Sequence, residues 1–167
     1  MENKTNVEIC IQELPQMRVA SCFTTSRSPE TEVINFLERW ALHRGLDFSK
    51  LRKFGFDIPV SEEQKKYGLR SYEFWVKVPD GIEQGYDGVK IKFVNTAKYA
   101  KLRIKNPFDD PQLKMRAGWN MLFDWVASHK VKRENGKETD EDKENYMLEE
   151  IVETNDATFI DLYFPME

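Results

Sequence analysis

Residues 71–78 read SYEFWVKV, and this stretch decides the fold class. Its even-numbered positions are all apolar or aromatic, whereas its odd-numbered positions are Ser71, Glu73, Trp75 and Lys77. Successive side chains of a β-strand point to opposite faces of the sheet. The alternation therefore predicts a strand with one face on the core and a second face that mixes charge with a large ring.

The same alternation returns near the end of the chain, where residues 159–164 read FIDLYF. Asp161 and Tyr163 share its odd face, opposite apolar even positions. Tyr99 lies on the corresponding face of a third predicted strand, because it alternates with apolar positions in residues 98–104. A merely solvated face would carry Lys, Thr, Ser and Glu rather than large rings at matching places. These odd faces are candidate binding surfaces.

The remaining elements follow in an order that occurs twice. Ser28-Pro29 predicts a helix start, apolar residues at helical spacing follow, and Gly45 lies past the end. A second helical pattern covers residues 113–126. Polar loops are predicted at 61–68 and 130–145. We expect strands at residues 7–11, 17–23 (a second strand or the return of a hairpin), 54–60, 72–78, 89–93, 98–104, 146–152 and 159–164.

This order predicts an internal repeat, with one copy at about 7–80 and the other at about 89–165. We interpret the chain as an α+β protein of two halves related by a pseudo-twofold. Each half places its helix on one face of an antiparallel sheet. Together the two halves form a single domain over residues 1–167.

Composition narrows the function classes. The chain has 167 residues and a formal net charge of −4, with no run of Lys and Arg that would bind phosphates, so we expect no direct nucleic-acid partner. No apolar stretch is long enough to span a membrane, and the polar residues 1–5 lack the apolar core of a signal peptide. We expect a cytoplasmic protein. No metal-ligand spacing and no phosphate loop is present, so neither a metal site nor a cofactor is predicted.

Aromatic residues make up 13% of the chain, which is more than a small core needs and indicates either a core of large rings or a pocket lined with them. The strand at 146–152 adds an acid, because Glu149 and Glu150 point to opposite faces among apolar neighbours. One of the two must therefore face inward, where a carboxylate is costly unless it is paired, protonated or in contact with a cationic ligand. A structural ion pair would be with Lys77, Lys101 or Arg103.

These residues resemble the GyrI-like small-molecule-binding (effector-binding) superfamily, which also forms the ligand domain of multidrug-responsive transcription activators. The resemblance runs from about Val7 to Pro165, and it depends on the joint order of its motifs because none is diagnostic alone. The motifs are Phe54-Gly55-Phe56-Asp57, residues 72–79 (YEFWVKVP), Tyr99-Ala100-Lys101-Leu102, residues 118–125 (GWNMLFDW), Leu148-Glu149-Glu150 and residues 161–165 (DLYFP).

The resemblance implies two fused strand–helix–strand–strand (SHS2-like) repeats, with a ligand cleft on the sheet face away from the helices. It also implies aromatic walls and a central acid suited to lipophilic cations. We place that acid at Glu149 first and Glu150 second. Ile151 follows where relatives often have His, so a third polar group at this point is not expected. The expected ligand-binding residues are Glu149, Trp75, Tyr99, Tyr163 and Glu73, with Phe56 and Trp119 at the edges.

Three functions remain open. The first is a bacterial, stand-alone effector-binding or drug-sequestering protein for small aromatic, cationic compounds. The second is a hydrolase of strained-ring, cyclopropane-bearing cytotoxic compounds, in which Glu149 would act with Tyr99 or Tyr163. The third is a gyrase-inhibitor-like interaction module with a protein partner, such as a regulator or gyrase. Only about six residues precede the first predicted strand, where activators carry a helix-turn-helix, so we do not expect operator binding.

Overall fold

The computed structural model describes residues 8–129 and 146–166, which divide into two units. The internal unit comprises Gln16–Asn95, and the terminal unit combines the residues up to Pro15 with those from Thr96 onward. Each unit contains four strands of an eight-stranded sheet, paired antiparallel within the unit, so the fold is α+β as predicted. The predicted loop at 130–145 lies outside the described residues. In the described part of the chain, no helix is long and apolar enough to cross a bilayer.

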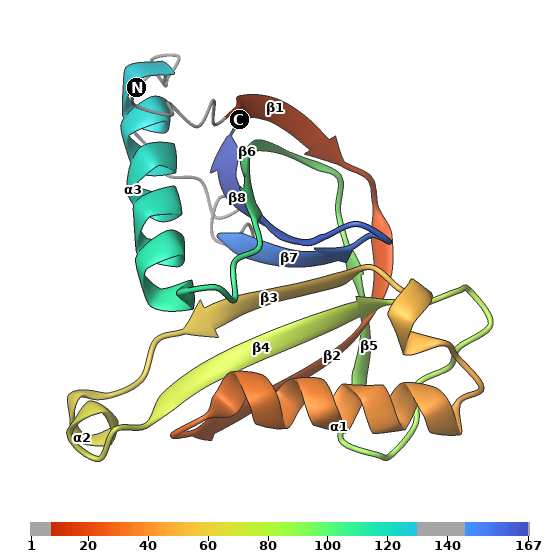
Figure 1. The fold of residues 1–167 in the computed structure, drawn as a ribbon. Helices are drawn as coiled ribbons and strands as arrows, with labels where there is room; N and C mark the ends of the chain where they lie inside the picture. Colours follow the sequence, from red (N-terminus) through yellow and green to blue (C-terminus); the bar gives the residue numbers. More distant parts are fainter. Residues whose placement is uncertain (1–7, 130–145, 167) are drawn as a thin grey trace, which may run out of the picture. The chain divides into compact units, whose positions relative to one another are not determined.

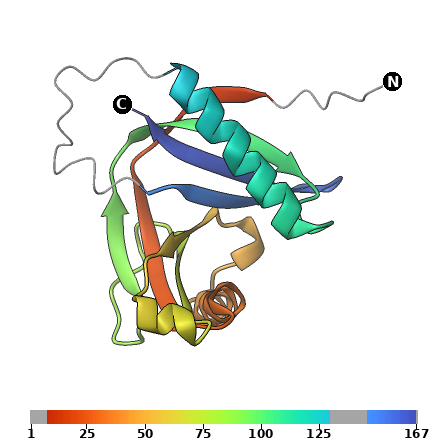
Figure 2. The same cartoon turned by 90° about the vertical axis from the view of Figure 1, so that its left-hand side faces the viewer.

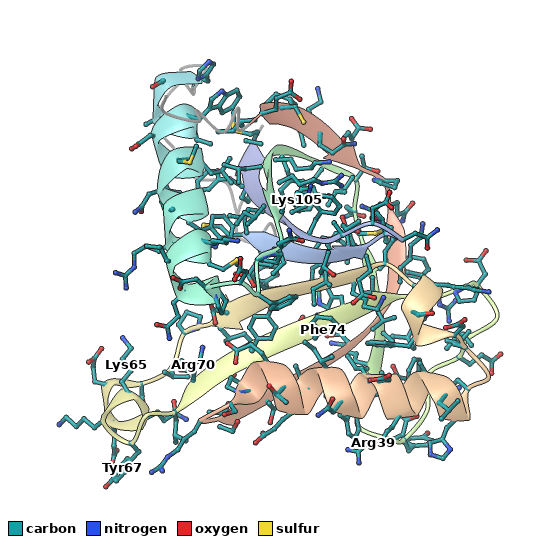
Figure 3. The ribbon with its side chains drawn as sticks, in the orientation of Figure 1. Arg39, Lys65, Tyr67, Arg70, Phe74 and Lys105 are labelled. Atoms are coloured by element: carbon teal, nitrogen blue, oxygen red, sulfur yellow. The ribbon has the colours of Figure 1, made fainter. Side chains whose placement is uncertain are left out.

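The internal unit has the strand order β3-β4-β2-β5, and helix α1 packs against β2 and β4 (Figure 1). Phe74 on β4 is fully buried and lies on the side of the strand toward α1 in Figure 3. The elements are β2 (Met17–Ser26), α1 (Pro29–His43), the 3-10 turn η1 (Phe48–Lys50), β3 (Lys53–Ile58), α2 (Glu62–Lys66), β4 (Arg70–Lys77) and β5 (Lys90–Val94).

Helix α1 begins and ends where the sequence predicts. Ser28 is the N-cap residue and Pro29 occupies the first turn, where a missing backbone N–H costs nothing. Val33, Leu37 and Trp40 form the buried stripe against the sheet. Gly45 follows the helix with a φ of +74°, a left-handed conformation that glycine adopts without steric penalty.

The predicted polar loop at 61–68 is wrong in one respect, because it contains the short helix α2. Ser61 and Gln64 form a capping box: the Gln64 N–H donates to Ser61 Oγ at 3.1 Å, and the Ser61 N–H donates to Gln64 Oε1 at 2.9 Å. Ser followed by Gln three residues later is the sequence signature of this cap. The helix has no buried residue, and so lacks the apolar periodicity on which helix prediction depends.

The terminal unit has the strand order β1-β6-β8-β7, and α3 lies across one face of this sheet (Figure 2). A core cluster joins the helix to the sheet through Leu102 on β6, Leu162 on β8 and Leu122 on α3. This contact confirms that the even face of residues 159–164 lies under the helix. The elements are β1 (Ile9–Leu14), β6 (Ala97–Lys105), α3 (Pro111–His129), β7 (Leu148–Glu153) and β8 (Thr158–Met166).

A hairpin of the first two strands, the alternative that the sequence left open, is wrong. β1 pairs with β6 in the terminal unit, with Ile9 opposite Leu102, whereas β2 pairs with β4 and β5 in the internal unit. Two-residue hairpin loops need residues that accept positive φ, and Pro15-Gln16 does not meet this requirement. The units therefore differ in extent from the predicted ranges 7–80 and 89–165. The internal unit has the short helix α2 between β3 and β4, and the terminal unit has no counterpart among its described residues, so the internal repeat and its pseudo-twofold stay predictions.

Candidate functional site

The strand register of β7 and β8 places a carboxylate on the same face of the terminal sheet as two tyrosines. Glu150 lies opposite Asp161, and Leu148 lies opposite Tyr163. Directly opposed residues of an antiparallel pair share a face. Leu162 belongs to the core under α3, so its neighbours Asp161 and Tyr163 point to the other face, together with Glu150.

Glu150 and Tyr163 form a buried hydrogen-bonded pair. The Tyr163 hydroxyl donates to Glu150 Oε1 at 2.7 Å. Tyr163 is only 1% exposed and Glu150 only 4%. A phenol donor stabilises a carboxylate without neutralising its charge. The pair therefore places a carboxylate and a phenol in direct contact within a buried region of this sheet face.

Tyr99 on β6 lies beside this pair. Its ring meets that of Tyr163 edge-to-face, with the centroids 5.6 Å apart and an interplanar angle of 82°. Tyr99 is 2% exposed, and burial raises the pKa of its phenol above the ordinary value. The hydroxyl therefore stays protonated through the physiological range and can donate or accept a hydrogen bond.

Asp161 is the second acid of this face, and it is already paired. Arg103 donates two hydrogen bonds to its carboxylate, from Nε at 2.7 Å and from Nη2 at 3.0 Å, and Lys101 Nζ lies 3.7 Å from Oδ2. The hydrogen bond with Asp161 raises the pKa of Arg103. Lys101 and Arg103 were predicted as partners for the inward glutamate, but their ion pairs in the structure are with Asp161.

The strand register places the two glutamates on opposite faces of the terminal sheet. Glu149 lies opposite Leu162 and therefore points to the α3 side, away from Tyr99 and Tyr163. Glu150, the second choice, is the buried glutamate on the tyrosine face. We refer to Tyr99, Glu150, Asp161 and Tyr163, with Arg103, as the tyrosine–glutamate cluster.

Trp119, predicted at the edge of the site, lies elsewhere. It packs against the core cluster under α3 and stacks on Phe123, with ring centroids 5.7 Å apart. Its spacing from Leu122 and Val126 is the spacing of an apolar helix stripe, and this signal in the sequence could have placed it in the core.

The internal unit carries its own cluster of rings and charges on β3, β4 and β5. Trp75 Nε1 donates to Glu73 Oε2 at 2.5 Å, and Lys92 Nζ lies 2.7 Å from the same oxygen. The Lys92 ammonium also lies 5.3 Å from the centre of the Trp75 ring, within range of a cation–π interaction. Phe56 meets Trp75 edge-to-face at 5.1 Å. We call these four residues the tryptophan–lysine cluster.

The predicted residues therefore fall into two groups, one in each unit. Lys92 is the member that sequence reasoning did not select, whereas Asp161 and Arg103 were noted there but not among the expected ligand-binding residues. Lys92 lies between the apolar residues Ile91 and Phe93 in a predicted strand. Its contacts with Glu73 and Trp75 depend on the pairing of β5 with β2, which alternation within one strand does not reveal. No three His, Cys, Asp or Glu residues gather as a metal site would require within residues 8–129 and 146–166.

Comparison with known proteins yields the fold rather than a family. No family model matches the sequence. No curated protein matches it either. Solved structures do match in shape. A cryo-EM structure of the EcmrR–DNA complex superposes over 96% of this chain with a TM-score of 0.67 and 14% identity, and this chain spans 57% of the length of EcmrR.

Three further structures share the fold at low identity. The EcmrR C-terminal domain matches over 97% of this chain and 98% of its own, with a TM-score of 0.62 and 13% identity. SAV2435 bound to tetraphenylphosphonium matches over 96% and 94%, with a TM-score of 0.51 and 11% identity. A hydrolase from Listeria innocua matches over 93% and 90%, with a TM-score of 0.56 and 9% identity. At these identities the similarity shows a shared fold.

Proposed function

We propose that this chain is a small-molecule-binding protein of the GyrI-like type, in which the two units act as one domain and their repeats are related by a pseudo-twofold. Its ligands are small aromatic cations, and the protein acts as an effector-binding or drug-sequestering module. The observation that carries the proposal is the buried Glu150 carboxylate, held by the Tyr163 hydroxyl at 2.7 Å beside the ring of Tyr99.

The chemistry of the tyrosine–glutamate cluster favours a cation. The faces of Tyr99 and Tyr163 attract a positive charge by roughly 0.5–2 kcal/mol each when water is excluded. Asp161 is balanced by Arg103, and Glu150, which accepts the hydrogen bond from the Tyr163 hydroxyl, is the acid that we expect a cationic ligand to contact. A lipophilic cation adds the burial of its own apolar surface, about 25 cal/mol for each Å² removed from water.

The tryptophan–lysine cluster supports the same preference. Lys92 places its ammonium against both the Trp75 ring and the Glu73 carboxylate, which is the arrangement that an aromatic site offers to a cationic ligand. In this unit the chain supplies that cation itself. A ligand would bind to Trp75, Phe56 and Glu73 only by displacing the Lys92 ammonium.

Binding at either cluster requires movement, because Tyr99, Tyr163, Glu150, Trp75 and Phe56 are each no more than 5% exposed. A ligand reaches these rings after the groups that cover them have shifted. We therefore expect association slower than diffusion, as is usual when binding requires a conformational change.

The test is a titration with tetraphenylphosphonium, the cation bound to SAV2435, followed by calorimetry. We expect saturable binding that Glu150→Gln weakens about tenfold, because the amide removes the charge and keeps the size. Glu149→Gln is the matched control, since it makes the same change on the opposite face of the same strand and should leave the affinity unchanged. Equal affinity of wild type and Glu150→Gln would overturn the proposal.

A hydrolase is the second candidate, favoured by the same 2.7 Å contact between Tyr163 Oη and Glu150 Oε1. A carboxylate and a phenol within hydrogen-bond distance can act as general base and general acid, one taking a proton from water while the other protonates the leaving carbon of a strained ring. Turnover distinguishes the two functions: product must exceed one equivalent of protein, and both Glu150→Gln and Tyr163→Phe must abolish it. Retention of a stable protein partner with neither ligand binding nor turnover would favour the interaction module.

A further inference from the structure

The internal unit contains a hollow that neither cluster uses. Its volume is about 450 Å³, within the range of small-molecule sites, and it lies along the second half of α1. Figure 3 places Arg39 on the side of α1 away from Phe74 and the sheet. The lining residues are Phe36, Arg39, Trp40, His43, Arg44 and Asp87.

Hydrogen bonds fix two of the lining side chains. Trp40 Nε1 donates to Asp87 Oδ2 at 2.8 Å, and Arg44 Nη2 donates to the same oxygen at 3.2 Å. The Arg44 guanidinium lies 5.4 Å from the centre of the Trp40 ring. Because Trp40 and Arg44 are both bound to Asp87, the ring presents a fixed surface to the hollow.

Two glycines, Gly85 and Gly88, let the backbone beside the hollow lie close to the side chains of α1. A side chain at Gly85 would place its Cβ 2.6 Å from Arg44 Nη2, so glycine leaves that guanidinium its space. Gly88 has a φ of +82°, and a Cβ there would lie 3.9 Å from the Phe36 ring. The backbone at 85–88 therefore holds Asp87 against α1 without filling the space between Phe36 and Trp40.

The charge of the hollow is positive. Asp87 is the only acid of the lining, and Arg44 pairs with it at 3.2 Å. Arg39 is exposed, and among residues 8–129 and 146–166 it makes no hydrogen bond or ion pair. Its guanidinium is thus available to a ligand, and it can bind a carboxylate with two parallel hydrogen bonds.

We propose that this hollow binds a small aromatic anion, such as an aromatic carboxylate. The aromatic ring lies against Phe36 and Trp40, and the carboxylate meets Arg39 at the rim. A cation is disfavoured there because the one acid is already paired and two guanidinium groups line the space. This site is separate from the tyrosine–glutamate cluster and prefers the opposite charge, so it stands or falls independently of the proposed function.

The experiment is a calorimetric titration with 2-naphthoate at ~0.15 M salt, where unspecific attraction between exposed charges is largely screened. We expect saturable binding to wild type that Arg39→Gln weakens roughly tenfold, the loss of a charge-assisted hydrogen bond. Arg116→Gln is the matched control, because it removes an exposed arginine from a helix of the other unit and should leave the affinity unchanged. Arg39→Lys should recover part of the affinity.

The cation of the same size, 2-naphthylmethylammonium, provides the charge test, and Arg39→Gln should not weaken its binding. Absence of naphthoate binding to wild type would overturn the proposal. So would naphthoate binding that Arg39→Gln and Arg116→Gln affect equally. Thermal unfolding of each variant confirms that a lost affinity is not lost folding, and the exposed position of Arg39 predicts an unchanged midpoint.

Discussion

The two clusters place an acid beside aromatic rings in different ways. In the internal unit Glu73 is bound by Trp75 and by the Lys92 ammonium, so its charge is balanced within the chain. In the terminal unit two acids have different partners: Asp161 accepts hydrogen bonds from Arg103, and Glu150 accepts one from the Tyr163 hydroxyl. A phenol satisfies a carboxylate oxygen and leaves the charge in place. The two clusters therefore hold their acids differently: an indole and an ammonium contact Glu73, whereas a phenol donates to Glu150.

Burial also separates the two ion pairs. The Asp161 side chain is 2% exposed, whereas those of Glu73 and Lys92 are 14% and 29% exposed. An ion pair near water contributes little to stability, while removal of one partner from a buried pair is costly because the other charge remains. The comparison therefore predicts that stability depends most on the Asp161 pair.

Replacement of Asp161 by alanine tests this ranking and should have the largest effect. It leaves Arg103 and Lys101 without their carboxylate and should lower the free energy of unfolding by about 3 kcal/mol, the lower end for a buried pair because Arg103 is half exposed. Urea denaturation measures the loss. Glu153→Ala, an exposed carboxylate at the end of β7, is the control and should cost under ~0.5 kcal/mol. Equal losses would contradict the role of burial.

Tyr163→Phe addresses the bond that distinguishes Glu150. The variant keeps the ring against Tyr99 and removes the donor to a buried carboxylate, so it should cost about 1–2 kcal/mol of unfolding free energy. Tyr67→Phe removes an equivalent hydroxyl from an exposed ring and should change stability little. If both variants unfold at the same urea concentration, the Tyr163 hydroxyl does not stabilise the fold.

Lys92→Met should have a smaller effect on stability, at most about 1 kcal/mol, because the pair that it breaks is partly open to water. It should also sharpen the comparison, since the Trp75 ring and the Glu73 carboxylate lose the cation that the chain supplies. We expect the variant to bind tetraphenylphosphonium more tightly than wild type. Titration of both proteins measures the difference, and weaker binding by Lys92→Met would show that Lys92 does not compete.

Tyr99→Phe has the smallest expected effect, which appears only in alkali. Burial raises the pKa of the Tyr99 phenol in the folded state. The stability that the protonated phenol contributes to the fold is therefore fully present below the ordinary pKa of 10.0, and it is lost as the pH rises through the folded-state pKa. The unfolded chain then ionises more readily than the fold. Wild type should therefore lose stability relative to Tyr99→Phe above pH 10.0, with no such divergence near neutrality. Urea titrations at both pH values decide this.

Alternation along single strands could be predicted from the sequence. It placed Tyr163 and Asp161 on the face away from α3, and it placed Trp75 with Glu73. It could not choose between Glu149 and Glu150, because each has apolar neighbours and the choice depends on which residue of β8 lies opposite. That register is a contact between strands, which periodicity within one strand does not contain.

The partners of edge strands were also beyond local reasoning. Chain proximity favours a hairpin of β1 with β2, yet β1 hydrogen-bonds to β6. Lys92 was overlooked for the same reason, since its neighbours come from a pairing between distant segments. The glutamate order and the Lys92 contact both depend on which strands lie side by side, and that is settled by the assembled sheet.

The division of the chain has a consequence for how the protein is made. All four strands of the internal unit lie within Gln16–Asn95, so they can pair with one another as soon as this segment has left the ribosome. The terminal unit instead needs β8 between β6 and β7, and β8 follows the other strands of this unit in the chain. The whole internal unit separates β1 from its partner β6, and such long-range pairing slows folding. We expect the internal unit to acquire protease resistance during translation before the terminal unit, which must wait for β8.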